Sequence, residues 1–148
     1  MTVFLFFILV AAGAALVVQN IIMMQMSVRA STILIVLLMN SAVGLVLLSA
    51  LLIARTGFGG IRELVSGFQP WAILPGLLGT FFVFASLLGY QRVGAAATVS
   101  ILVASQLLLG LTVDLARTGS PSPVTHLPSL VGAALLVLGA YLVVSRSI

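Results

Sequence analysis

The residues of this chain best suited to binding a ligand are those with amide or hydroxyl side chains inside otherwise apolar stretches. They occur in four stretches, as Gln19, Asn20, Asn40, Ser41, Ser86, Tyr90, Ser100, Ser105 and Gln106. Such groups form hydrogen bonds with neutral or zwitterionic molecules, and in hydrocarbon each costs free energy unless it has a partner. For any one residue, hydrogen bonding between helices is as good an explanation as cavity lining. For the set, we predict a shared substrate-binding cavity.

Asp114 is the one ionisable residue inside an apolar stretch, and Arg117 follows it three residues later. This spacing favours a structural ion pair at a membrane interface over a role in coupling protons or cations to transport. Gln106, Gly110 and Asp114 share one broad face of the same predicted helix. Because no carboxylate lies at mid-depth, we expect a neutral, zwitterionic or lipid-like substrate.

The sequence offers no pattern typical of an enzyme or a metal site. It contains no cysteine, which excludes disulfides, thiolate metal sites and thiol redox chemistry. No nucleophile–base pair and no cluster of metal ligands stands at motif spacing. We therefore expect a protein that is not an enzyme and that carries no metal or other cofactor.

Five apolar segments must hold the polar residues in place. The chain has 148 residues, of which 62% are hydrophobic and 5% charged. About 20 apolar residues cross the hydrocarbon core, and each segment must be helical because lipid offers no partners to backbone polar groups. We predict an all-α membrane protein with a single integral membrane domain over residues 1–148. Its five transmembrane helices are expected at about residues 3–26, 32–54, 70–89, 94–116 and 129–145.

The six arginines divide equally between the two membrane faces. With side B defined as the face that carries the N-terminus, side A receives Arg29, Arg92 and Arg146, and side B receives Arg55, Arg62 and Arg117. Orientation follows the excess of Lys and Arg in short loops, so a chain without an excess has no preferred orientation. The arginines are scattered singly, which favours the lipid bilayer, and not nucleic acid, as their partner.

The connections between the predicted spans differ in length on the two sides. Residues 27–31 and 90–93 are predicted to form tight hairpins on side A. On side B, residues 56–69 place apolar residues at helical spacing, which indicates a short amphipathic segment at the interface. Residues 118–128 contain three prolines and are predicted to form a non-helical link.

Small residues indicate how the helices pack. Gly76, Gly79, Val83, Ser86 and Tyr90 follow a spacing of three to four residues, and we interpret this face as a packing surface within one protomer. The stripe on the last helix, made of Gly132, Ala133, Leu136, Gly139 and Ala140, fits either internal packing or the seam of a dimer.

Taken together, these residues resemble the YdcZ-type family of five-span bacterial inner-membrane proteins in the drug/metabolite transporter superfamily. The resemblance covers almost the whole chain and rests on Gln19, the segment 40–44, Pro70 and Trp71, Gly76, Gly79, Val83, the segment 92–94, Gln106, Asp114, Gly132 and Gly139. It implies an exporter of the bacterial inner (cytoplasmic) membrane. Superfamily relatives have ten spans in two inverted halves, which implies that a five-span chain acts as an antiparallel pair.

Three positions depart from the pattern expected for the family. Met23 stands where an asparagine is expected, Asn40 where a serine is expected, and Ser105 where a glycine is expected. The first departure weakens the transfer of a binding role to the first helix, although Asn20 is a neighbouring substitute. The other two keep a small or polar side chain in place.

The hypothesis that joins these observations is a secondary transporter of a small organic solute that works by alternating access. An odd number of spans paired with an inverted copy gives an inverted repeat, so we expect an antiparallel homodimer or a pair with a closely related paralogue. Two alternatives stay open: an accessory or assembly subunit of a membrane complex, and a translocase of a lipid-linked substrate.

Overall fold

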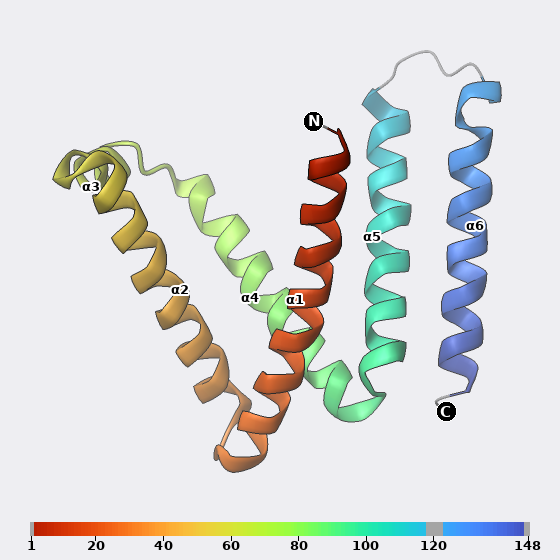
Figure 1. The fold of residues 1–148 in the computed structure, drawn as a ribbon, viewed down its shortest axis with the longest axis horizontal. Helices are drawn as coiled ribbons and strands as arrows, with labels where there is room; N and C mark the ends of the chain where they lie inside the picture. The colour runs from red at the N-terminus through yellow and green to blue at the C-terminus, as the bar shows by residue number, and fades with distance from the viewer. Residues whose placement is uncertain (1, 118–122, 147–148) are drawn as a thin grey trace. The chain divides into compact units, whose positions relative to one another are not determined.

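The computed structural model describes residues 2–117 and 123–146, and the elements it contains in these ranges are helices. In chain order they are α1 (Thr2–Arg29), α2 (Ile33–Thr56), α3 (Phe58–Ser66), the 3₁₀ turn η1 (Pro70–Ala72), α4 (Ile73–Arg92), α5 (Ala95–Arg117) and α6 (Pro123–Ser145) (Figure 1). Five stretches of the described chain are long and apolar enough to cross a membrane: Val3–Arg29, Ile33–Thr56, Pro70–Arg92, Ala95–Asp114 and Leu127–Ser145. The prediction of five candidate membrane-spanning helices is confirmed.

The chain forms two compact units. Unit 1 comprises Met1–Ile21 and Leu88–Ile148, and unit 2 comprises Ile22–Leu87. In unit 1, α5 and α6 lie side by side and run in opposite directions (Figure 1). Unit 2 has a small apolar core in which Leu87 and Val36 are almost completely buried and Met23 and Leu37 complete the cluster. Most other apolar side chains of the spans are exposed, as lipid-facing residues must be.

Arginines stand at the C-terminal ends of the long helices. Those in the last turn of α1, α2 and α4 are Arg29, Arg55 and Arg92. Arg117 is the last residue of α5, and Arg146 directly follows α6. A cation there is stabilised by the partial negative charge of the helix terminus. Successive membrane-spanning helices end on alternate sides of a membrane. Arginines at the C-terminal ends of these helices are therefore expected on alternate faces.

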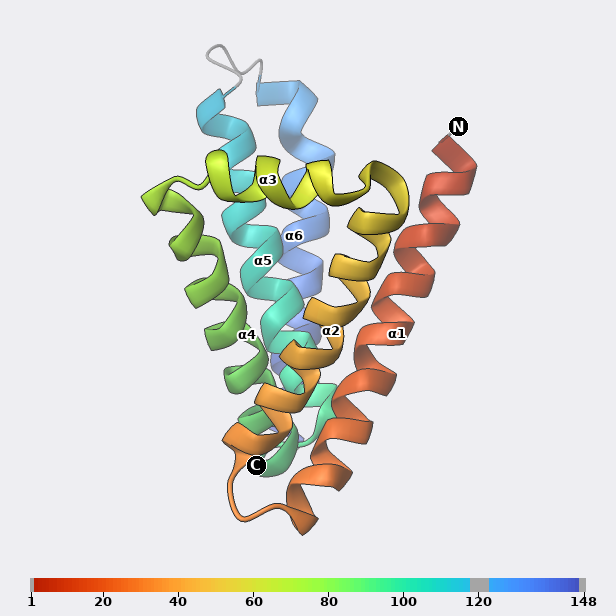
Figure 2. The ribbon, with the colours of Figure 1, turned by 90° about the vertical axis from the view of Figure 1, so that its left-hand side faces the viewer.

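The short helix α3 lies across the C-terminal end of α2 (Figure 2). Gly60 makes this contact, since a Cβ there would collide with Thr56 Oγ1 and lie 3.0 Å from Leu52 Cδ1. Its apolar residues Phe58 and Val65 are 81% and 72% exposed. The helix therefore presents a free apolar side, as the spacing of its residues predicts for a segment at the membrane interface.

The connections on both sides are shorter than the sequence indicates. The prediction of a non-helical link over residues 118–128 is wrong for its second half, because α6 begins at Pro123 and includes Pro128. Proline is tolerated at the start of a helix, where backbone donors have no partner, so Pro123 suits the first position of α6. Pro128 stands inside the helix, where it removes one backbone hydrogen bond and crowds the preceding turn. Residues 118–122 lie outside the described part. On the other side, α1 continues to Arg29 and α4 to Arg92, so the predicted hairpins are mostly helical.

Candidate substrate-binding sites

A cavity of about 270 Å³ lies between α2 and α4 in unit 2. We call it the α2/α4 cavity, and its lining residues are Leu37, Asn40, Ser41, Gly76, Gly79, Thr80 and Val83. Asn40 contributes an amide to the lining, and Ser41 and Thr80 contribute hydroxyls. Thr80 Oγ1 donates a hydrogen bond to Gly76 O at 2.9 Å, which leaves its lone pairs to accept from a ligand. The cavity thus combines polar groups with apolar walls, as binding sites for small molecules do.

Two glycines of α4 create this space. A Cβ added at Gly76 or at Gly79 would meet no atom within 4 Å. The interpretation of this stripe as a tight packing surface is therefore wrong at these two positions, which hollow out a cavity. The close approach on α4 comes later, at Gly89, where a Cβ would lie 2.6 Å from Thr98 Cγ2 of α5. Ser86 is fully buried and donates to Phe82 O at 2.7 Å.

A second cavity, of about 550 Å³, lies between α5 and α6 in unit 1. We call it the Asp114 cavity, and its lining residues are Gln106, Leu107, Gly110, Leu111, Asp114, Ser129, Gly132, Ala133 and Leu136. Gln106, Gly110 and Asp114 do face one space, as their spacing on the helix predicts. The side chain of Arg117 lies outside the described part, so its ion pair with Asp114 stays a prediction.

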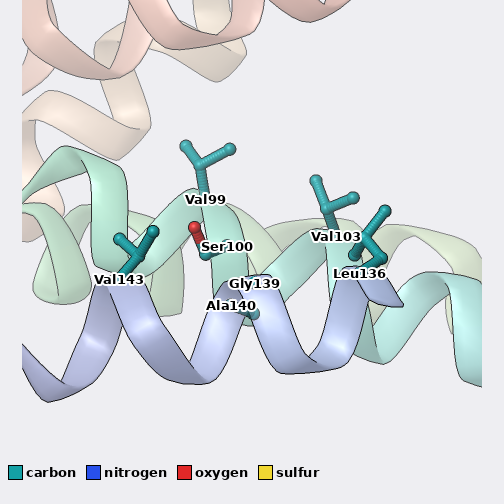
Figure 3. A pocket seen from close by; sticks show the side chains of 7 residues that line it. All are labelled: Val99, Ser100, Val103, Leu136, Gly139, Ala140 and Val143. Atoms are coloured by element: carbon teal, nitrogen blue, oxygen red, sulfur yellow. The ribbon is translucent and has the colours of Figure 1, made fainter. Parts of the chain in front are cut away.

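A third cavity, of about 360 Å³, lies on the same pair of helices. Figure 3 shows the side chains of Val99, Ser100, Val103, Leu136 and Val143 standing on one side, above a floor made by Gly139 and Ala140. Ser100 is the one polar side chain among these lining residues, so the surface is mainly apolar. Ala133 and Ala140 are buried and face cavities beside α5, which favours internal packing over a dimer seam for this stripe of α6.

The remaining predicted residues lie in α1, α4 and α5. Asn20 is buried and Gln19 is exposed. Ser105 donates to Leu102 O at 2.8 Å, so its hydroxyl proton is used within its own helix. Tyr90 is 4% exposed, and its hydroxyl has no hydrogen-bond partner among the described residues.

The predicted binding residues are divided between the two units. Asn40, Ser41 and Ser86 belong to unit 2, and the other predicted binding residues belong to unit 1. A single shared cavity therefore stays a prediction. The sequence reasoning missed Thr80, whose position one turn after Gly76 on the same face was a usable signal.

The chain has several apolar helices of membrane-spanning length, and cavities with polar lining residues lie between neighbouring helices. These features define a multi-pass α-helical membrane protein. Residues 4–142 match the family model described as "Putative inner membrane exporter, YdcZ", and the chain belongs to this family. It is 53% identical over 119 residues to "Inner membrane protein YdcZ" of Escherichia coli (strain K12), an alignment that covers 80% of this chain and 79% of that protein. No solved structure matches the chain. The protein is thus a multi-pass protein of the inner membrane, and the resemblance inferred from its sequence is confirmed.

Proposed function

We propose that this protein exports a small organic solute by alternating access, and that the α2/α4 cavity binds the solute. The observation that carries the proposal is an amide and two hydroxyls on the walls of one cavity between two apolar helices. Polar groups inside a membrane span are costly unless they serve packing or a ligand pathway. Here the packing explanation is weakened because Gly76 and Gly79 leave the space beside them open.

The size of the cavity supports a small solute. Its volume of about 270 Å³ lies just below the range of roughly 300–1,000 Å³ typical of sites for drug-sized molecules. A lipid-linked sugar would exceed it. The chemistry fits a neutral or zwitterionic solute that offers donors to Thr80 and complementary groups to Asn40.

The arrangement we propose for transport is an antiparallel pair of chains. Five spans place the two ends of the chain on opposite sides, and the arginines give neither orientation an advantage. An inverted partner would supply the half of the pathway that opens to the other face. A homodimer satisfies this requirement directly, and a closely related paralogue of opposite orientation would satisfy it equally.

Transport is tested by comparing the solutes released by cells that make each variant at equal membrane levels. Gly79→Leu fills the α2/α4 cavity and Asn40→Ala removes its amide, so both should lower the efflux of the same solute. Gly44→Leu is the matched control, since Gly44 is an open glycine of α2 that is not among the cavity residues. Altered stability or association of the variants with unchanged efflux would favour the accessory subunit instead.

Orientation is tested in the cysteine-free background. Ser31→Cys and Ser120→Cys place single thiols in connections on opposite sides, and intact cells are treated with an impermeant maleimide. Two orientations in one membrane should give about equal labelling at both positions. Labelling at one position alone would exclude the antiparallel homodimer.

A further inference from the structure

A further cavity, of about 470 Å³, lies at the C-terminal end of α1, in unit 2. We call it the Arg29 cavity, and its lining residues are Ile22, Gln25, Met26, Val28 and Arg29. The residues at positions 22, 25, 26 and 29 share one face of the helix. Ile22 marks the inner end of this face and Arg29 its outer end, about 10 Å apart along the helix axis. The cavity therefore combines an apolar inner part with an amide and a guanidinium further out.

The length of α1 brings this cavity to the level of the lipid headgroups. The 28 residues of the helix extend about 42 Å, which matches the roughly 40–45 Å of a bilayer with both headgroup layers. Arg29 is the last residue of the helix, and Gln25 lies about 6 Å deeper, near the boundary of the hydrocarbon core. Both side chains are exposed on the surface of the chain, where a lipid can reach them.

No carboxylate side chain of the protein serves Arg29. The two acidic residues are Glu63 and Asp114. Glu63 belongs to α3, at the opposite end of α2, and the 24 residues of α2 separate it from the Arg29 cavity by about 36 Å. Asp114 has an interaction of its own, whereas neither Arg29 nor Gln25 forms a side-chain hydrogen bond or ion pair within the described part of the chain. An anion that pairs with this guanidinium has to come from another molecule.

We infer that the Arg29 cavity binds one phospholipid, whose phosphate accepts hydrogen bonds from Arg29 and Gln25. The first part of an acyl chain then lies along the apolar surface of Ile22 and Met26. A guanidinium is permanently charged, and its planar fork matches the oxygens of a phosphate. Since the C-terminal end of a helix carries a partial negative charge, the attraction for phosphate comes from this side chain and not from the backbone.

The size and place of the cavity agree with this occupant. Its volume of about 470 Å³ lies within the roughly 300–1,000 Å³ of small-molecule sites, which suits a headgroup whose acyl chains continue into the bilayer. None of its lining residues lines the α2/α4 cavity. The site is therefore separate from the one proposed for export.

The test is native mass spectrometry of the purified protein, which counts the lipids bound to each chain during a titration in non-ionic detergent. The probe is phosphatidylglycerol, and its comparison compound is diacylglycerol with the same acyl chains and no phosphate. The first phosphatidylglycerol should bind about tenfold or more tightly than diacylglycerol, because only the phosphate accepts charge-assisted hydrogen bonds. Arg29→Gln should abolish this preference and leave the affinity for diacylglycerol unchanged.

Matched variants separate the site from the general attraction between arginines and anionic lipid. Arg55→Gln removes the same charge from the last turn of α2, in the same unit, and should bind phosphatidylglycerol as the native protein does. Arg29→Lys keeps the charge but loses the fork, so its affinity should fall between those of the native protein and Arg29→Gln.

The amide of the cavity has its own control. Gln25→Leu should weaken the binding of phosphatidylglycerol about threefold, because one hydrogen bond to the phosphate is lost. Gln69→Leu removes an exposed amide of the same unit that is not among the cavity residues, and it should leave the affinity unchanged.

Three results would overturn the inference. The first is equal binding of phosphatidylglycerol by Arg29→Gln and either the native protein or Arg55→Gln. The second is binding of glycerol 3-phosphate as tight as that of phosphatidylglycerol, which would assign a soluble phosphate ester. The third is weaker self-association of Arg29→Gln with unchanged lipid binding, which would assign the anion to a second copy of the chain.

The titration requires no gradient, so its outcome does not depend on the proposed export. Conversely, equal efflux by the Gly79→Leu and Gly44→Leu variants would contradict export through the α2/α4 cavity and leave the phospholipid site standing.

Discussion

The contact between α4 and α5 at Gly89 gives the sharpest test of the structure. A Cβ at this position would lie 2.6 Å from both Thr98 Cγ2 and Thr98 Oγ1, and 3.2 Å from Thr98 Cβ. Thr98 is 5% exposed, and its hydroxyl donates to Gly94 O at 2.7 Å. Rotation about its χ1 cannot remove both close atoms, because only one of the three staggered positions holds hydrogen. Gly89→Ala must therefore displace one of the two helices.

The expected cost follows from two opposing terms. Forcing an extra methyl group into a packed contact costs about 1–3 kcal/mol. Against this cost, alanine stabilises a helix interior by about 0.5–1 kcal/mol relative to glycine. The net destabilisation should be about 0–2.5 kcal/mol, which corresponds to a fall of up to roughly 10 °C in the unfolding midpoint. Gly79→Ala on the same helix gains the higher helix propensity of alanine, and its Cβ would meet no atom within 4 Å. This variant should therefore be as stable as the native protein or more stable.

The assay is thermal unfolding in a non-ionic detergent, followed by the fraction of monodisperse protein after heating. Thr98→Ala removes the two atoms nearest to the added methyl group. The variant that carries both Gly89→Ala and Thr98→Ala should therefore be less destabilised than the sum of the two single destabilisations. The reasoning is refuted if Gly89→Ala is as stable as Gly79→Ala, or if the two substitutions are additive.

Three further predictions concern single positions. Gly57→Ala should cost about 1–3 kcal/mol in the same unfolding assay, because its φ of 62° and ψ of −159° belong to a region that essentially only glycine adopts; Gly59→Ala, where the space is open, should not. Tyr90→Phe should leave stability unchanged or raise it, because it removes a buried hydroxyl that has no partner in the described part of the chain; a loss of efflux at unchanged stability would instead assign the hydroxyl to substrate binding. Arg62→Ala should shift maleimide labelling towards the orientation with side A in the cytoplasm, whereas Arg62→Lys should leave it balanced.

The predicted equal division of the arginines between the two membrane faces can be traced to the helix boundaries. Arginines at the ends of the five long helices would give three on side A and two on side B. Arg62, in the amphipathic helix α3, is the sixth and makes the numbers equal. The balance therefore depends on an interfacial helix, and its removal should show in the orientation of the chain.

Local signals predicted well those features that depend on one segment at a time. The number of candidate spans follows from hydropathy, and α3 follows from the spacing of its apolar residues. The start of α6 was missed because three prolines in residues 118–128 read as a loop. The first position of a helix tolerates proline, because the backbone donor it lacks would have no partner there, so Pro123 fits either structure. Pro128 stands inside α6, which local rules do not predict.

The sequence by itself determined that this is a membrane protein of the YdcZ family with five candidate spans, because hydropathy and motif order are properties of the chain alone. The lack of an orientational preference stays a prediction from the placement of its arginines. The tertiary structure decided what each small or polar residue faces. Gly79 and Gly89 are glycines of one helix, yet the first lines a cavity beside Asn40 and the second approaches Thr98 closely. The difference arises from the helix that lies opposite, and no pattern within a single helix records its neighbour.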